Sequence, residues 1–557
     1  TEASDFYWDP IDKDIIRMKW DDPYAGTDIN KTPARELVDM TTTGNELIAT
    51  NPEKKGLKFN ALTASFNFSD NIIHAEGVRF INVGDAAIIP YDGKVTIREK
   101  AEIEKLNYAR LVAGRANKYH ELYNVIATIN SGADFRGSGD YDYIDENQMV
   151  QKIHFDTLWY YQETKGMAQI PMEANFKFSP EFGFNGRAEL SSQYQFLNFV
   201  GGVELIHECD EVKYARMRIN SRIDPNYILI EVSEKTKDVN DRKVVNAIAS
   251  TNKEGRIYTC FGGAKDQFND SEYISAFGYI MFDKASQEFR AASLEKLQNP
   301  SLPGNMIVLN KRDCISKGTG TLDMGAKLGR VDFVTNGTIV NYMKADSAEM
   351  NLTTSIDFFF NDKAMSVLSN ALTASYSLDF FDYSNDDSYE MALINMMGED
   401  EYLKYQKQVV MGGQVKKLPK KLQVQFLFSN IDFIWDKTNK AFVSQTLLPL
   451  IICGSKEINK VVPGRIVIEK RGSRNKLYIY FEFDDAFYFF QFENNSMYGY
   501  SSETKFMDAI MAVDAKKRTI KSGEGQPSFT YKWGNRSQKN KFVKKFYNFV
   551  AEEGDEE

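Results

Sequence analysis

Apolar and polar positions alternate along most of this chain, beginning near Gly56. The first alternating run covers residues 64–68 (Ala-Ser-Phe-Asn-Phe), and others follow at 73–81, 94–97 and 109–113. Each run is short, has a period of two, and ends near Gly, Asn or Asp, which is typical of β-strands joined by turns. The pattern continues to about Phe360, so we predict one β domain over residues 56–360. Residues 1–55 are mixed and polar, and we predict an irregular N-terminal segment there.

Two partial repeats within residues 56–360 indicate how these strands are arranged. Residues 64–70 are echoed at 174–180, and an apolar strand with a central glycine recurs at Gly77, Gly202, Gly278 and Gly337. The spacing between these glycines is unequal, which argues against an array of fixed period. We therefore expect an irregular β-solenoid or a stacked β-jellyroll, with a large closed sandwich as the structural alternative.

A helical pattern replaces the alternation after Phe360. Asp362 can cap a helix that has Met365, Leu368 and Leu372 on one face. A second helical run extends from about Asp386 to Met411, and its apolar positions are Met391, Ile394, Met397, Tyr402 and Tyr405. A methionine-rich face can form a groove for a cofactor or partner, but core packing is the commoner role and is our prediction. Residues 361–415 are thus expected to be a helical connector.

Strands return in residues 416–557, for which we predict a separate α+β domain. Alternating or continuous apolar runs occupy 422–428, 448–453, 465–468, 477–483 and 487–492. Asp484 and Asp485 separate the last two runs and predict an antiparallel hairpin. Its aromatic residues could stack on sugars or form an exposed edge, but a buried role is more common.

Two helices are expected to complete this domain. The first begins after a Ser502 cap and carries Phe506, Ile510 and Val513. The second carries Phe542, Phe546, Phe549 and Val550 opposite Lys541, Lys544 and Lys545. An acidic tail, Glu552–Glu557, follows and is predicted to be solvated.

Composition and charge narrow the classes of protein. The 39 Phe and 29 Tyr residues favour strands over helices. The net charge of -10 disfavours nucleic acid as a partner, because phosphate binding requires a basic surface. No apolar run is long enough to span a membrane. A chain that begins with Thr1 is expected to be a processed product or a piece of a longer protein.

The four cysteines, Cys209, Cys260, Cys314 and Cys453, lie far apart in the sequence. A chain of this size does not need a disulfide framework, so we expect mostly free, buried thiols. One disulfide bridge remains an open alternative.

No catalytic group is identified among the histidines, which are His74, His120, His154 and His207. His207, Glu208 and Cys209 suggest a nucleophile with its base. However, we place these residues in an alternating strand, where neighbours point to opposite faces and Glu208 cannot meet the other two. His207 and Cys209 share a face, but zinc requires three or four ligands and no second pair is visible.

Acidic residues cluster at residues 137–147 (Gly-Ser-Gly-Asp-Tyr-Asp-Tyr-Ile-Asp-Glu-Asn). Calcium prefers such oxygen donors, but the spacing is not that of an EF-hand loop, so we predict a solvated hairpin turn. Asp382, Asp386 and Asp387 form a poorer cluster, which we interpret as a loop leading to a helix cap. We therefore predict no catalytic residues, no cofactor-binding residues, no metal ligands and no cofactor.

Several segments resemble a family of very long, uncharacterised cell-envelope proteins of Bacteroidota. They are residues 73–78 (Ile-His-Ala-Glu-Gly-Val), 84–90, 93–97, 118–120, 139–143 and 281–285. More distantly, the rhythm of strands and glycines resembles the OstA-like jellyroll proteins of lipopolysaccharide transport. The resemblance implies an exported protein, located in the periplasm or associated with the outer membrane, and excised from a longer parent.

We therefore expect a non-enzymatic scaffold or binding protein of the bacterial cell envelope. Its expected partners are other envelope proteins, lipid or glycan, and not nucleic acid. A carrier of lipid or lipopolysaccharide with an open jellyroll groove is the first alternative. A β-helical enzyme that acts on envelope glycans is the second.

Overall fold

The computed structural model describes residues 5–547, except 10, 12–13, 21–27, 252–254, 326–327, 384–385, 413–417, 471–474 and 524–525. Strands make up 49% of the structure and helices 17%, so the prediction of a mainly β protein is confirmed. The predicted acidic tail, together with Phe549 and Val550, lies outside the described residues. No helix in the described part of the chain combines the length and the apolar character that a membrane crossing requires.

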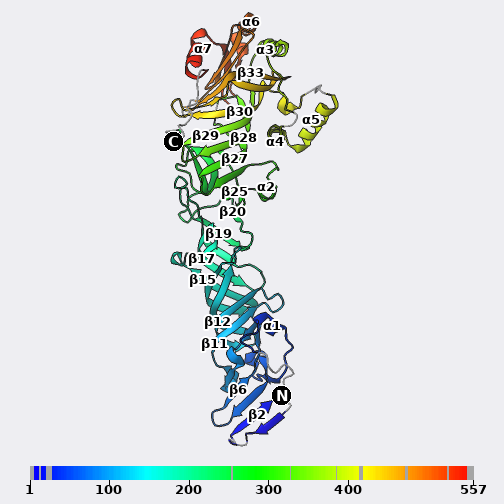
Figure 1. Ribbon diagram of the computed structural model, residues 1–557, viewed down its shortest axis with the longest axis vertical. Helices are drawn as coiled ribbons and strands as arrows, with labels where there is room; N and C mark the ends of the chain where they lie inside the picture. Colours follow the sequence, from blue (N-terminus) through cyan, green and yellow to red (C-terminus); the bar gives the residue numbers. More distant parts are fainter. Residues whose placement is uncertain are drawn as a thin grey trace. The chain divides into compact units, whose positions relative to one another are not determined.

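The chain forms two compact units. Unit 1 consists of Thr1–Ile206 and Arg216–Leu229, and unit 2 of His207–Ala215 and Ile230–Glu557. In Figure 1 the ribbon of unit 1 runs from blue to cyan, and that of unit 2 continues through green to red. This division differs from the predicted one, because the boundary falls inside the predicted β domain of residues 56–360.

Unit 1 is built on an antiparallel sheet of eleven strands, most of which pair with their neighbours in the sequence. The strands are β7 (Ile81–Val83), β8 (Ala86–Ile89), β11 (Leu106–Ala113), β12 (His120–Ser131), β13 (Asp134–Ile144), β14 (Val150–Tyr161), β15 (Glu163–Ile170), β16 (Lys177–Ser179), β17 (Phe182–Ser191), β18 (Asn198–Leu205) and β19 (Met217–Arg222). Their long ladders of backbone hydrogen bonds match the alternation seen in the sequence.

Smaller elements complete unit 1. A six-stranded sheet has the order β1-β2-β5-β6-β9-β10, and β3 pairs with β4. These strands are β1 (Asp5–Trp8), β2 (Ile15–Lys19), β3 (Asn45–Ile48), β4 (Lys58–Ala61), β5 (Thr63–Asn67), β6 (Ile72–Glu76), β9 (Val95–Arg98) and β10 (Glu102–Ile103). The segment predicted as irregular therefore contains strands, and its short helix α1 (Ala34–Asp39) packs against β11.

The core of unit 1 is aromatic and tightly filled. Phe178 and Phe199 are fully buried, and their ring centroids lie 4.7 Å apart. Phe184 and Phe176 pack against the same pair, with centroids 5.0 Å and 6.0 Å from Phe178 and Phe199 respectively. Because alternate residues of β12 to β18 point to this side, the strands bury one continuous apolar face.

Unit 2 contains a sixteen-stranded sheet, in the order β20-β24-β25-β26-β27-β28-β29-β30-β31-β33-β34-β35-β36-β38-β37 with β32 beside β30 and β33. The strands are β20 (Ile230–Val232), β24 (Gly278–Asp283), β25 (Glu288–Ala292), β26 (Met306–Asn310), β27 (Ile315–Leu322), β28 (Asp332–Tyr342), β29 (Ser347–Asp357), β30 (Phe426–Asp436), β31 (Ala441–Ser444), β32 (Leu447–Cys453), β33 (Lys456–Glu469), β34 (Lys476–Phe483), β35 (Ala486–Glu493), β36 (Ser496–Ser501), β37 (Thr519–Ile520) and β38 (Phe529–Trp533). A second sheet has the order β22-β21-β23, from β21 (Val245–Ser250), β22 (Ile257–Gly263) and β23 (Ser271–Ser275). The strands predicted for residues 416–557 thus extend the same sheet as those before residue 360.

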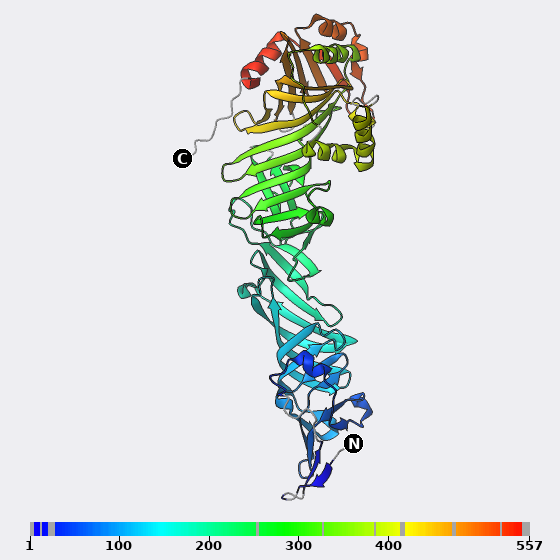
Figure 2. The same cartoon turned by 45° about the vertical axis from the view of Figure 1, so that its right-hand side comes forward.

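The predicted helical connector is an insertion between two paired strands. It contains α3 (Asp362–Ala374), α4 (Asp387–Met397) and α5 (Glu399–Gly412), and the strands on either side of it, β29 and β30, are hydrogen-bonded neighbours. Figure 2 shows these helices in yellow-green beside the sheet of unit 2. The single run predicted for 386–411 is broken at Gly398, whose φ of 88° ends α4.

The remaining helix predictions hold in outline, with different caps. Asn361 caps α3 in place of Asp362, and Glu503 caps α6 (Thr504–Met511) in place of Ser502. The prediction of core packing for α4 holds for Met397, which is buried in a core cluster with Leu427 and Ile452, and Ile394 is partly buried against that cluster, whereas Met391 is not part of it. Two further short helices are α2 (Leu294–Gln298) and α7 (Arg536–Phe542).

The aromatic hairpin of unit 2 is confirmed as β34 and β35, which pair from Lys476–Glu493 to Phe483–Ala486. Both of its faces are covered. On one face Tyr478, Tyr480 and Phe489 pack against Phe542 of α7 and Phe546. On the other, Phe481 and Phe490 pack against Phe426, with ring centroids 5.6 Å and 5.4 Å away. The hairpin is therefore core structure, which leaves neither face free to stack on a sugar.

One disulfide bond closes within unit 2, between Cys209 and Cys314, whose Cα atoms are 5.3 Å apart. It ties the segment His207–Ala215 to the turn between β26 and β27 across a sequence separation of 105 residues. The expectation of free, buried thiols holds for Cys260 and Cys453, and burial raises the pKa of the Cys260 thiol to about 12.

Breaking this bond is expected to destabilise unit 2. We expect the double substitution Cys209→Ser and Cys314→Ser to lower the free energy of unfolding by about 2–4 kcal/mol, because the reduced chain gains loop entropy when it unfolds. Denaturant titration with and without reductant measures this. The reductant should destabilise the native sequence and leave the double variant unchanged; equal sensitivity of the two would contradict the assignment.

Candidate functional site

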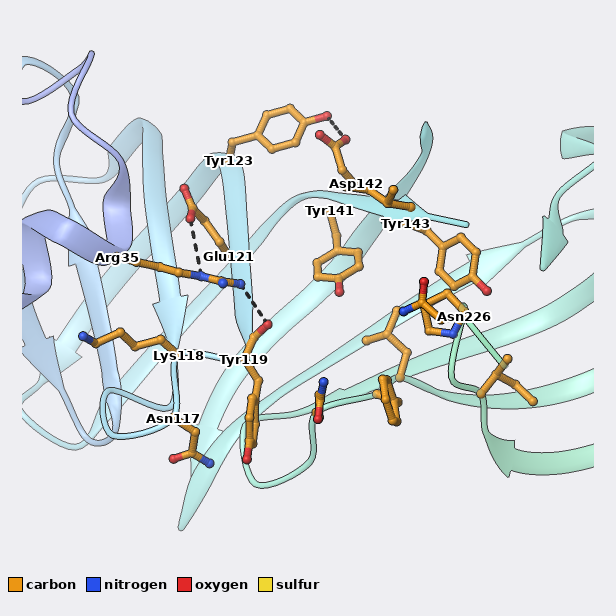
Figure 3. Close-up of a pocket in the computed structure, with 16 residues that line it drawn as sticks. Arg35, Asn117, Lys118, Tyr119, Glu121, Tyr123, Tyr141, Asp142, Tyr143 and Asn226 are labelled. Carbon is orange, nitrogen blue, oxygen red and sulfur yellow. Dashed lines mark hydrogen bonds and ion pairs between the residues drawn. The ribbon is translucent and has the colours of Figure 1, made fainter. Parts of the chain in front are cut away.

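A cavity of about 510 Å³ in unit 1 is the site where hydrogen-bonding and aromatic side chains converge. It is lined by residues from α1, β12 and β13, from the segment 195–197, and from the segment 223–226. Figure 3 shows that side chains from these separate segments lie around one hollow. Volumes of roughly 300–1,000 Å³ are usual for sites that bind small molecules.

Four tyrosines form the aromatic part of the wall: Tyr119, Tyr123, Tyr141 and Tyr143. Tyr119 precedes β12 and Tyr123 lies on β12. Tyr141 and Tyr143 are two positions apart on β13, so both point to the same side of that strand. Pairing of Tyr123 with Asp140 in the ladder places Tyr123 on the side of β13 that carries Asp140 and Asp142, whereas Tyr141 and Tyr143 point to the other side of that strand. The site is therefore a product of the register between β12 and β13.

Packing behind the cavity fixes two of these rings. The Tyr141 ring lies 5.8 Å from the His120 ring and 6.1 Å from that of Phe155. Tyr143 is buried, and its hydroxyl donates to the backbone carbonyl of Phe178 at 3.3 Å. A ligand would therefore meet rings whose orientation is set before it binds.

The charged groups of the wall are largely paired with one another. The Arg35 guanidinium donates to the Tyr119 carbonyl at 3.2 Å and lies 3.9 Å from the Glu121 carboxylate. The Tyr123 hydroxyl donates to Asp142 at 2.7 Å. These three contacts are the dashed lines in Figure 3. The cavity thus presents hydrogen-bonding groups in fixed orientations, and these include both positively and negatively charged side chains.

Burial raises the pKa of three tyrosines that line the cavity. It raises the pKa of Tyr141 and Tyr143, and burial followed by the hydrogen bond to Asp142 raises the pKa of Tyr123 to about 12. Among the described residues that line the cavity there is no Ser, Cys or His.

The histidines lie in three kinds of environment. His120 is buried behind the cavity, where its Nε2 lies 2.8 Å from the carbonyl of Tyr194 and burial lowers its pKa. His154 is half-exposed and donates to Asp140 at 2.7 Å. His74 lies on β6, as predicted, and is exposed.

The prediction that His207, Glu208 and Cys209 share an alternating strand is wrong. Strand β18 ends at Leu205, and the three residues lie in a loop. Among the described residues, no strand pairs with this segment beyond Leu205. His207 Nδ1 accepts the backbone N–H of Cys209 at 3.2 Å, and the Cys209 sulfur is in the disulfide, so it cannot serve as a nucleophile.

The acidic cluster at 137–147 lies mainly on strand β13, which runs to Ile144, rather than in the predicted hairpin turn. Only Asp145 and the residues after it form the turn, where Asp145 accepts the N–H groups of Asn147 and Met149. Burial alone would raise the pKa of Asp140, but hydrogen bonds from His154 and Asn124 outweigh it and lower that pKa.

The second acidic cluster is a helix cap, as predicted. The Asp386 carboxylate accepts the backbone N–H groups of Ser388 and Tyr389 at the start of α4. In the part of the chain that the structure describes, no three residues among His, Cys, Asp and Glu form a group that could hold a metal ion.

The tyrosine-lined cavity is the feature that the sequence analysis missed. The available signal was the spacing of Tyr119, Tyr123, Tyr141 and Tyr143 on two consecutive alternating segments. No protein-family model matches this sequence, and no curated protein matches it either.

The hydrogen bond between Tyr123 and Asp142 gives a pH prediction. We expect Asp142→Asn to lower the pKa of Tyr123 from about 12, yet to leave it above the ordinary value of about 10, because burial is the larger cause. A raised pKa favours the neutral phenol in the folded state. The resulting stabilisation is therefore complete below pH of about 10 and is lost as the pH rises through about 12.

Absorbance titration of tyrosine ionisation measures this pKa, and Tyr123→Phe identifies which step of the titration belongs to Tyr123. An unchanged high-pH step in Asp142→Asn would show that the carboxylate does not act on Tyr123.

Proposed function

We propose that this chain is a non-enzymatic, extracytoplasmic binding or scaffold protein of a bacterial cell envelope, and that unit 1 holds a glycan in its tyrosine-lined cavity. The observation that carries the proposal is the convergence of Tyr119, Tyr123, Tyr141 and Tyr143 with amide and charged groups around one hollow.

A sugar ring matches this wall chemically. It has an apolar C–H face, which packs on aromatic rings, and a rim of hydroxyl groups that both donate and accept hydrogen bonds. Asn117 and Asn226 line the same cavity and can make both kinds of bond. Polar groups at fixed positions within a partly apolar wall are what give a ligand site its orientation.

An adjacent hollow supports a ligand longer than one ring. This second hollow, of about 600 Å³, shares Phe196 with the first and is also lined by Trp159 and Tyr194. Its polar floor is organised, because Asn198 donates to Glu189 and to Asn220 at 3.0 Å each. An oligosaccharide could occupy both hollows, with Phe196 between neighbouring rings.

The two alternatives have weaker support. A lipid carrier needs open apolar volume, whereas the apolar face of the large sheet in unit 1 is filled by its own phenylalanines, with Phe178 and Phe199 fully buried. An enzyme on glycans needs a free acid and base, whereas Glu121 and Asp142 each have a partner within the cavity.

The disulfide supports an exported location, since such bonds persist in oxidising compartments and are rare in the cytosol. The long antiparallel sheets, in which most strands pair with their chain neighbours, are meanders, so the solenoid or stacked-jellyroll arrangement stays a prediction. The resemblance to envelope proteins of Bacteroidota points to the same setting.

Titration calorimetry with envelope glycans and their fragments tests the proposal. We expect saturable binding by the full chain, and Tyr119→Ala should weaken it by roughly ten-fold, because loss of one stacked ring removes about 1–1.5 kcal/mol. The exposed side chain of Tyr119 makes this substitution compatible with folding.

Tyr161→Ala is the matched control, because Tyr161 is an exposed strand tyrosine of the same unit that lines neither hollow. Failure of every glycan to bind, or equal losses in the two variants, would refute the assignment. Turnover of any glycan by the purified chain would refute its non-enzymatic part.

A further inference from the structure

Unit 2 contains a smaller cavity, whose chemistry differs from that of the two hollows in unit 1. Its volume is about 270 Å³, which limits a ligand to a small group. It is lined by residues of α4 and α5, by Phe380, Asp382, Tyr383 and Asp386, and by Asn459 of β33. Figure 1 shows α4 and α5 side by side next to this sheet, and α4 packs on β27, β28 and β30.

Five aromatic side chains contribute to the wall: Phe380, Tyr383, Tyr389, Tyr402 and Tyr405. The rings of Tyr383 and Tyr389 meet edge to face, with centroids 5.0 Å apart. Tyr405 and Tyr402 are buried on α5, and the Tyr402 hydroxyl is hydrogen-bonded to Glu390 of α4. A cluster of aromatic faces attracts a cation through the ring quadrupoles.

The charges around this cavity all have one sign. Asp382, Asp386 and Glu390 line it, and no Lys, Arg or His is among its described lining residues. The nearby ammonium of Lys460 donates instead to the carbonyls of Thr373 and Ser375. A ligand that enters the cavity therefore meets three acidic side chains and, among the described lining residues, no basic one.

One buried polar atom in the wall has no partner in the described part of the chain. Tyr389 is 2% exposed, and its hydroxyl makes no hydrogen bond with any residue that the structure describes. Burial also raises the pKa of Tyr389, so this group stays a neutral hydroxyl whose oxygen is available as an acceptor. An unpaired buried hydroxyl is costly, and a ligand N–H group in the cavity would satisfy it.

We infer that this cavity binds a small organic ammonium ion. The cation contacts the faces of the aromatic rings, and the carboxylates supply the opposite charge. The Tyr389 hydroxyl accepts a hydrogen bond from the ammonium group if that group carries an N–H. A neutral molecule of the same size gains only the apolar contacts. The inference stands on unit 2 alone and does not depend on glycan binding by unit 1.

Titration calorimetry of the full chain with methylammonium, tetramethylammonium and the neutral tert-butanol tests it at constant ionic strength. We expect both ammonium ions to bind and tert-butanol not to bind. Glu390→Gln should weaken the binding of both ions by roughly ten-fold, since it removes a charge and keeps the shape of the side chain.

Tyr389→Phe separates the hydrogen bond from the charge. We expect it to weaken the binding of methylammonium several-fold and to leave the binding of tetramethylammonium unchanged, because only the first ion carries N–H groups. This variant should fold, since the hydroxyl that it removes has no partner among the described residues.

Glu399→Gln is the control for general electrostatics, because Glu399 is exposed at the start of α5 and does not line the cavity. Absence of binding by both ammonium ions, equal binding of tert-butanol, or an effect of Glu399→Gln as large as that of Glu390→Gln would overturn the inference.

Discussion

Both units depend on burying one apolar face of a long antiparallel sheet. Neighbouring strands satisfy each other's backbone hydrogen bonds, but alternate side chains of every strand still have to leave water together. In unit 1 the phenylalanines around Phe178 and Phe199 meet this requirement by packing on one another. In unit 2 helices meet part of it, as where Phe542 covers the hairpin of β34 and β35. Cavities then form where loops and helices leave the rest of the surface incompletely covered.

Local alternation predicted the strands well because the period of two is a property of a few adjacent residues. The hairpin at 477–492 and the strand predicted at 109–113, which lies within β11, are examples. The pairing of β29 with β30 could not be read in the same way, since the helices at 362–412 separate the two strands in the sequence. The predicted domain boundary at residue 360 depended on that missing information.

The sites were harder to predict than the strands, for a related reason. The wall of the cavity in unit 1 depends on which residue of β12 faces which residue of β13, and a shift of one position would turn the tyrosines to the other side. The disulfide between Cys209 and Cys314 similarly depends on a loop that the alternation around His207 made to look like a strand. By contrast, the cap formed by Asp386 needs only the next few residues, and it was predicted correctly.

The break at Gly398 has a geometric effect that reaches beyond the end of α4. Tyr389 and Tyr402 are thirteen positions apart in the sequence. On one unbroken helix their side chains would point about 140° apart around the axis, away from any common partner. The non-helical backbone at Gly398, with a φ of 88° and a ψ of 152°, changes the direction of the chain, and both rings border the same space. A residue with no side chain of its own thus determines which other side chains can act together.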